Sequence, residues 1–212
     1  MMNSANTVDK SILRSIRARH GAAVFSAKEF ERLGNAAAVR QALSRLARAG
    51  TIRRIRQGLY DLPRKHPIIG QTAPDPMAAV RALMEGSQAQ WQVSGAYAAN
   101  LLGLSEQVPA KIVILTDGVP RRVSLGKLTL TFRRVAPRNL LAAGRPAGLV
   151  IQALRHLRAE GLEEAQLLEL RSRLEPSART ELAQLSPKLA AWMRPLVKKL
   201  TLVEKACGAY CN

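Results

Sequence analysis

Apolar and polar positions alternate most regularly between residues 35 and 50. Apolar side chains recur there at the three- and four-residue spacing of a helix, at Val39, Leu43 and Leu46. Asn35 is a favourable N-cap for this helix, and Gly50 is a favourable end. The pattern therefore predicts an amphipathic helix with one apolar stripe facing inward.

A two-stranded ribbon is expected directly after this helix. Residues 51–56 alternate as a strand, and the turn at residues 57–58 leads into a second strand at residues 59–62. Before the helix, the pattern predicts a helix at residues 7–20, a strand at residues 23–25 and a helix at residues 27–33. Helix, strand, helix, helix and ribbon is the order of a winged helix-turn-helix. We therefore predict such a domain at residues 1–66.

The rest of the chain predicts a second, small α+β domain that ends in a helical array. Proline and glycine concentrate in residues 67–76, which favours a linker. Short strands are expected at residues 91–93, 111–116, 121–124 and 127–132, and helices from residue 146 onward. The last of these helices is expected from residue 187 or 188 to residue 200, kinked or divided at Pro195. The predicted fold class is α+β, with a regulatory domain at residues 77–204 and a flexible tail at residues 205–212.

Positive charge is concentrated in the predicted N-terminal domain. The chain carries 33 Lys or Arg against 15 Asp or Glu, a formal net charge of +18. Residues 1–66 hold 14 of the basic and 4 of the acidic side chains, and no acid occurs between Glu31 and Asp61. A GC-rich genome that prefers arginine codons is the alternative explanation for the excess. The clustering favours a polyanionic partner, and with a winged helix that partner is a DNA duplex.

Geometry assigns a role to each candidate DNA contact. On the exposed face of the helix at residues 35–50, base edges are assigned to Gln41, Ser44 and Arg45, and phosphates to Arg40 and Arg48. The ribbon contributes Arg53, Arg54 and Arg56, of which alternation points the last two to the same side. At the start of the helix at residues 27–33, a phosphate contact is assigned to Ser26 and Lys28, with Glu29 completing a capping box. Tyr60 is expected to pack the ribbon onto the first helix.

Catalytic and metal-binding motifs are not evident. The three histidines, His20, His66 and His156, lie in different segments without ligand spacing. Asp117 precedes Gly118 and is interpreted as a turn residue, and Lys127 has no second acid nearby to form a nuclease site. Neither a Walker loop nor a G-x-G-x-x-G motif occurs. We predict no enzymatic activity, no cofactor and no metal.

The expected location is the cytoplasm. No window of 18 apolar residues and no signal-peptide core occur. Cys207 and Cys211 lie in the predicted tail, too close to the end of the chain for a disulfide between them to stabilise the fold.

Several motifs, in this order, resemble the AbiEi-type antitoxins of type IV toxin-antitoxin systems. They are Ser26-x-x-Glu29-Phe30, the helix at residues 35–50, GLYDLP at residues 58–63, SGAYAANLLGL at residues 94–104 and KIVILTDG at residues 111–118. The resemblance implies a repressor that binds inverted repeats in its own promoter, as a monomer or weak dimer that binds cooperatively. It also implies an antitoxin against a nucleotidyltransferase toxin, with or without a stable complex.

The sequence leaves open the partner of a second basic surface and two alternative functions. A second basic surface is predicted in the C-terminal half, where it would face DNA, the toxin or the toxin's RNA substrate: Arg121, Arg122, Arg133, Arg134 and Arg138. The alternative function is a stand-alone winged-helix regulator whose second domain senses a ligand or oligomerises. A third, less favoured hypothesis is that the protein is an enzyme that acts on nucleic acid.

Overall fold

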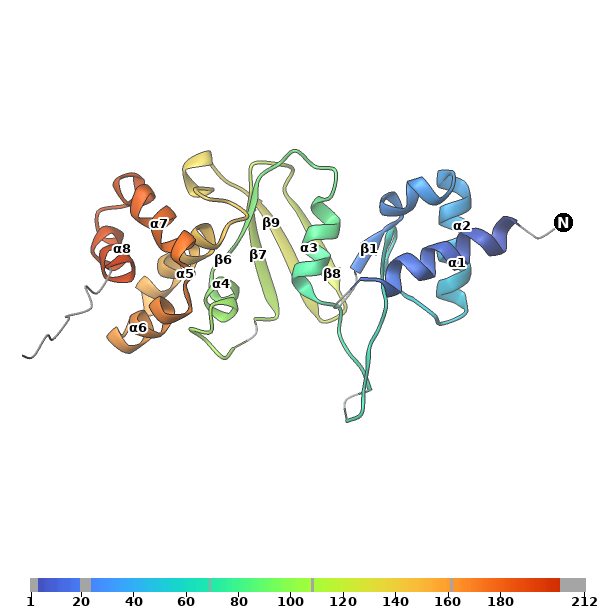
Figure 1. Ribbon diagram of the computed structural model, residues 1–212, viewed down its shortest axis with the longest axis horizontal. Helices are drawn as coiled ribbons and strands as arrows, with labels where there is room; N and C mark the ends of the chain where they lie inside the picture. Colours follow the sequence, from blue (N-terminus) through green and yellow to red (C-terminus); the bar gives the residue numbers. More distant parts are fainter. Residues whose placement is uncertain (1–3, 20–23, 69, 108, 161, 203–212) are drawn as a thin grey trace, which may run out of the picture. The chain divides into compact units, whose positions relative to one another are not determined.

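The computed structural model describes residues 4–19, 24–68, 70–107, 109–160 and 162–202 (Figure 1). Helices and small sheets are mixed along them, which confirms the predicted α+β class. The chain divides into two compact units, one of residues 1–88 and 124–127 and one of residues 89–123 and 128–212. The predicted tail, with Cys207 and Cys211, and His20 lie outside the described residues.

The first unit begins with the elements that the sequence predicts, in the same order. They are α1 (Ser4–Arg17), β1 (Val24–Ser26), η1 (Ala27–Leu33), α2 (Ala36–Arg48), β2 (Arg53–Arg56) and β3 (Leu59–Asp61). The strands form an antiparallel sheet in the order β1-β3-β2. One difference is the geometry of η1, which is a 3-10 helix. At seven residues, η1 is longer than most 3-10 helices, which rarely exceed about three or four residues.

Helix α2 has the boundaries and the buried face that the sequence predicts. The side chain of Asn35 accepts a hydrogen bond from the backbone N–H of Ala38 at 2.8 Å, which caps the first turn. Val39, Leu43 and Leu46 are buried in the core of the unit. The other face of the helix is therefore left to solvent.

Aromatic side chains hold the sheet of the first unit to its helices. Tyr60 on β3 stacks on Phe25 of β1, with ring centroids 6.3 Å apart, and Phe30 of η1 meets Phe25 edge to face at 5.5 Å. The same core contains Ile12 and Ile16 of α1. Tyr60 thus belongs to the same core as the first helix, but the ring on which it stacks is that of Phe25 on β1.

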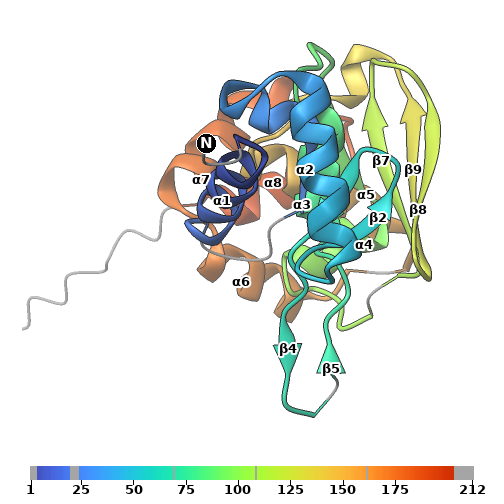
Figure 2. The ribbon, with the colours of Figure 1, turned by 90° about the vertical axis from the view of Figure 1, so that its right-hand side faces the viewer.

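The segment after β3 contains regular structure. Figure 2 shows β4 (Lys65–His66) and β5 (Gly70–Gln71) as a short hairpin. Asp75 then caps α3 (Pro76–Met84) by accepting from the backbone N–H of Met77 at 3.0 Å. Helix α3 packs against β1, and the first unit runs to residue 88. The contact of α3 with a strand some fifty residues earlier has no local signal in the sequence, which predicts a linker at residues 67–76.

The second unit is built on a four-stranded sheet in the order β6-β7-β9-β8. The strands are β6 (Trp91–Ser94), β7 (Lys111–Thr116), β8 (Arg121–Leu125) and β9 (Leu128–Arg134). Strand β7 runs antiparallel to β6 and parallel to β9, with Leu115 opposite Arg133. The helical elements are α4 (Ala96–Leu101), η2 (Pro137–Asn139), α5 (Pro146–Glu160), α6 (Glu164–Arg173), α7 (Pro176–Leu185), η3 (Ser186–Lys188) and α8 (Met193–Thr201). Helix α5 packs on β6 and on α4.

The last helix is shorter than the sequence predicts. Only η3 forms at the expected start, and α8 begins at Met193. Pro195 consequently lies in the first turn of α8, where its missing N–H breaks no helical hydrogen bond.

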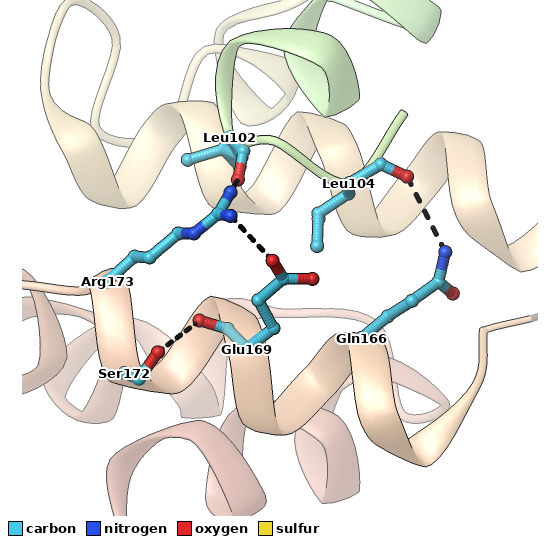
Figure 3. Close-up of polar contacts among 6 residues, drawn as sticks. All are labelled: Leu102, Leu104, Gln166, Glu169, Ser172 and Arg173. Atoms are coloured by element: carbon cyan, nitrogen blue, oxygen red, sulfur yellow. Dashed lines mark hydrogen bonds and ion pairs between the residues drawn. The ribbon is translucent and has the colours of Figure 1, made fainter. Parts of the chain in front are cut away.

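Helix α6 is fastened to the end of α4 through backbone carbonyl groups (Figure 3). Arg173 donates from Nη1 to the carbonyl oxygen of Leu102 at 3.0 Å and from Nη2 to Glu169, one helical turn earlier. Gln166 donates to the carbonyl oxygen of Leu104 at 3.5 Å. Gly103 lies beneath the guanidinium of Arg173, and a Cβ atom at this position would overlap it.

Among the described residues, no helix combines the length and apolar character needed to span a bilayer.

Candidate nucleic-acid interface

The outward face of α2 presents the polar residues that the sequence predicts there. Arg40, Gln41 and Arg48 are exposed, and Ser44 is half-buried. Within the described part of the chain, no ion pair joins Arg40 or Arg48 to an acid. These two guanidinium groups therefore remain accessible to an external anion.

Arg45, the predicted reader of base edges, is held by the first helix. Its Nε lies 3.0 Å from Oδ2 of Asp9 and its Nη2 lies 2.6 Å from Oδ1 of the same carboxylate. The hydrogen bond with Asp9 raises the pKa of Arg45. The side chain stays 42% exposed, so the pair lies at the surface. A contact between Arg45 and DNA would have to compete with this carboxylate.

Of the three arginines of β2, one is partly buried in an ion pair and two are exposed to solvent. Arg53 donates to both carboxylate oxygens of Asp61, with an Nε–Oδ1 distance of 2.9 Å, and to the carbonyl oxygen of Thr72 at 2.9 Å. The hydrogen bond with Asp61, which is only 3% exposed, raises the pKa of Arg53. Arg54 and Arg56 are exposed, on either side of a β-bulge in the β2–β3 pairing. The structure therefore gives Arg53 a structural role and leaves Arg54 and Arg56 to solvent.

The predicted phosphate position at the start of η1 is occupied by an acid of the chain itself. The carboxylate of Glu29 accepts the backbone N–H of Ser26 at 2.5 Å and also pairs with Arg19. Lys28 is exposed. Because the negative charge of Glu29 lies at this end and η1 is only seven residues long, this end offers little to a phosphate.

The predicted second basic surface is divided between two faces of the sheet in the second unit. The guanidinium of Arg121 lies 4.6 Å from the ring centroid of Phe132, so Arg121 shares the face of Phe132. Strand alternation places Arg134 on that face and Arg122 and Arg133 on the other. Arg138 lies in η2 and is exposed. The five arginines therefore do not form one continuous stripe.

The residues considered for catalysis have separate positions. Asp117 accepts the backbone N–H of Gln90 at 2.9 Å, which gives it the structural role expected of a turn residue. His156 lies in α5, and the side chain of His66 is not described. Within the described residues, no group of three or more His, Cys, Asp and Glu side chains has an arrangement that would hold a metal ion.

Comparisons with known proteins place the chain in a family. No curated protein matches the sequence. The crystal structure of the RV2827C protein from Mycobacterium tuberculosis is similar to this chain over 93% of its length and 80% of the other chain, with 18% sequence identity and a TM-score of 0.42. A family described only as one of unknown function, DUF6088, matches residues 11–182, which is most of the chain. The protein belongs to the DUF6088 family.

Proposed function

We propose that the first unit is a winged helix-turn-helix that binds duplex DNA. The observation that carries this proposal is the exposure of guanidinium groups on two neighbouring elements, Arg40 and Arg48 on α2 and Arg54 and Arg56 on β2. Three carboxylates of the unit, those of Asp9, Asp61 and Glu29, pair with Arg45, Arg53 and Arg19 instead. Arg40, Arg48, Arg54 and Arg56 stay accessible, at positions where a recognition helix and a wing would meet a duplex.

In this proposal α2 is the recognition helix and the β2–β3 ribbon is the wing. Gln41 and Ser44 lie on the outward face of α2 and read base edges, while Arg40 and Arg48 contact phosphates on either side. Arg54 and Arg56 contact the backbone or the minor groove beside them. Arg45 contributes to base reading only when it leaves Asp9, so its contribution is smaller than that of an unrestrained arginine.

The resemblance to AbiEi-type antitoxins supports a more specific role. We propose that the protein represses its own operon by binding inverted repeats and opposes a nucleotidyltransferase toxin. The order of motifs from Ser26 to Gly118 supports this role, because it extends beyond the DNA-binding unit into the sheet of the second unit.

The DNA-binding proposal is tested by titrating the full chain against a labelled duplex from its own upstream region. Gel shift or fluorescence anisotropy is measured across a salt series, with a scrambled duplex of equal length as the control. We expect sequence-selective binding whose log–log salt slope is about −0.9 per phosphate contacted. Weak binding that is equal on both duplexes would overturn the repressor role.

The antitoxin role is tested separately by co-expression. If a nucleotidyltransferase reading frame lies beside the gene, its product should arrest growth when expressed alone, and this protein should restore growth. A variant with Arg54→Ala and Arg56→Ala separates the two roles, because it loses repression and keeps protection if the second unit carries the antitoxin activity. Growth arrest that persists with abundant protein would overturn the antitoxin role and leave the DNA-binding result unaffected.

A further inference from the structure

A pocket of about 450 Å³ opens on the second unit, between its sheet and helix α5. Its polar lining comes from β6, β9, η2 and α5: Ser94, Arg133, Asn139, Gln152, Arg155 and His156. This volume lies in the range of about 300–1,000 Å³ that is common for small-molecule sites. Local sequence patterns do not predict this pocket, because its walls lie up to 62 residues apart in the chain.

Regular structure positions both arginines. Arg133 lies near the end of β9, opposite Leu115 of β7 in the parallel register, and Leu115 forms part of the pocket wall. Arg155 projects from α5, the helix that packs on β6. Gln152 and His156 lie one helical turn from each other, with Arg155 between them, and form a single polar stripe. The same helix buries Val150, Ile151 and Leu154 in the core, which fixes its rotation and so the direction of the stripe.

The pocket has a pronounced positive charge. Its lining contains two guanidinium groups and an imidazole, and no Asp or Glu. Arg155 is half-buried, and its Nη1 lies 3.4 Å from Oδ1 of Asn139, a neutral acceptor at the limit of hydrogen bonding. Burial lowers the pKa of Arg155, because the loss of hydration is not offset by a neighbouring carboxylate. A partly buried cation in this environment gains free energy when an anion enters.

We propose that this pocket binds the phosphate group of a small phosphorylated molecule. Guanidinium groups bind phosphate oxygens in paired hydrogen bonds, and Arg133 and Arg155 approach from two different elements, the sheet and the helix. The volume exceeds what a phosphate ion fills, and Leu115 and Val135 provide apolar wall for the remainder of the ligand. The phosphate belongs either to a free mononucleotide-like metabolite or to the 5′ end of a nucleic-acid strand. This inference concerns the second unit alone and does not depend on DNA binding by the first.

Isothermal titration of the full chain tests the proposal with adenosine monophosphate, adenosine and inorganic phosphate as probes. We expect adenosine monophosphate to bind at least tenfold more tightly than adenosine. A dinucleotide with a 5′-phosphate and the same dinucleotide without it distinguish the two sources of phosphate. Tighter binding of the phosphorylated dinucleotide than of the monophosphate identifies a strand end, and the reverse identifies a free metabolite.

Substitutions locate the binding. Arg155→Gln is expected to weaken binding of adenosine monophosphate at least tenfold, and Arg133→Gln gives an independent test from the sheet side, where folding of α5 is not perturbed. Arg158→Gln is the matched control, because this arginine lies on the same helix but stacks on Trp192, 4.6 Å from the ring centroid, outside the pocket. Equal loss in all three variants would show general charge attraction and overturn the proposal. No difference between adenosine monophosphate and adenosine would also overturn it. So would the absence of binding of either at about 10 mM, ten times a Kd of 1 mM.

Discussion

The guanidinium of Arg45 lies against the carboxylate of Asp9, so the recognition-helix candidate α2 and the first helix share an ion pair on the face proposed to meet DNA. The two residues are 36 positions apart in the chain. Phosphate or guanine would therefore meet an arginine that already has an anionic partner. Asp9 lowers the positive potential of this face at the position where base contacts are proposed.

Replacing Asp9 with asparagine should strengthen DNA binding. Asp9→Asn removes the competing charge, and we expect affinity for the upstream duplex to rise by up to about fivefold, with a salt slope that is steeper by about one phosphate contact. Fluorescence anisotropy across a salt series measures both. Glu31→Gln is the control, because it removes the same charge from the same unit at an exposed position of η1. An equal gain in both variants would show that only net charge matters.

Arg54 on the proposed wing should contribute to binding of any duplex. Arg54→Ala is expected to weaken binding to the upstream and scrambled duplexes alike and to make the salt slope shallower by about 0.9, the value of one lost phosphate contact. Thermal unfolding should change little, because Arg54 is exposed. Gln41→Ala provides the contrast, since loss of a base contact affects the upstream duplex alone. A selective loss with Arg54→Ala would contradict the assignment to phosphate.

Replacing Arg53 should lower the stability of the first unit more than it weakens DNA binding. Arg53→Met leaves the carboxylate of Asp61, which is 3% exposed, without its cation. We expect a loss of about 1–3 kcal/mol, below the 3–5 kcal/mol of a fully buried pair because the Arg53 side chain is 32% exposed. Urea unfolding measures this loss. The double variant with Asp61→Asn should recover part of the stability, and an unchanged midpoint in Arg53→Met would contradict the structural role.

The carboxyl group of Glu85 should contribute less to the stability of the first unit at neutral pH than in mild acid. Burial, and next the neighbouring carboxylate of Glu29, raise the pKa of Glu85, while Arg19 partly opposes the shift. A raised pKa means that the folded chain binds the proton more tightly than the unfolded chain. The resulting stabilisation is complete below the unfolded value of about 4.3 and is lost as pH rises through the raised value.

Glu85→Gln tests this sign. The variant should be more stable than the parent at pH 7, by less than about 1 kcal/mol because solvent screens the largely exposed Glu85. Near pH 4 the two proteins should unfold at the same temperature. Thermal unfolding followed by circular dichroism at both pH values measures the difference, with Glu31→Gln as the control. A gain of equal size at both pH values would contradict the pH dependence.

A side chain added at position 103 should force the guanidinium of Arg173 to move away from the carbonyl oxygen of Leu102. Its φ of +72° already favours glycine, and an added Cβ would overlap the guanidinium of Arg173. Gly103→Ala is expected to lower stability by about 1–3 kcal/mol. Gly144→Ala is a matched control in the same unit, with a φ of +74° and no atom within 4 Å of the added Cβ. The two variants should therefore differ by the effect of the close approach, and equal losses would show that φ alone is responsible.

The sequence predicted elements better than it predicted partners of charged residues. Capping and periodicity are local, and they located α2 from Asn35 and its apolar stripe correctly. The register of the β2–β3 ribbon could not be predicted from local patterns. A regular turn at residues 57–58 would pair Arg54 with Asp61, but the β-bulge between Arg54 and Arg56 shifts the register, and Arg53 lies opposite Asp61. A bulge of one residue thus decides which arginine is internal and which is exposed.

The pocket in the second unit had one signal in the sequence. Helix α5 is apolar over most of its length, and Gln152, Arg155 and His156 interrupt it at helical spacing. That stripe indicates a polar surface on a core helix, but it does not reveal what lies opposite. Arg133 reaches the same pocket from β9, and only the parallel pairing of β7 with β9 brings it there.

The attachment of α6 has a consequence for how the sequence is free to change over evolution. Arg173 and Gln166 bind the carbonyl oxygens of Leu102 and Leu104, which every amino acid carries, so these contacts place no demand on the side chains at positions 102 and 104 (Figure 3). The demand falls on position 103, where any side chain would displace the arginine. In related chains, we expect glycine at 103 to accompany arginine at 173. Residue 102 should vary without loss of the contact between α6 and the end of α4.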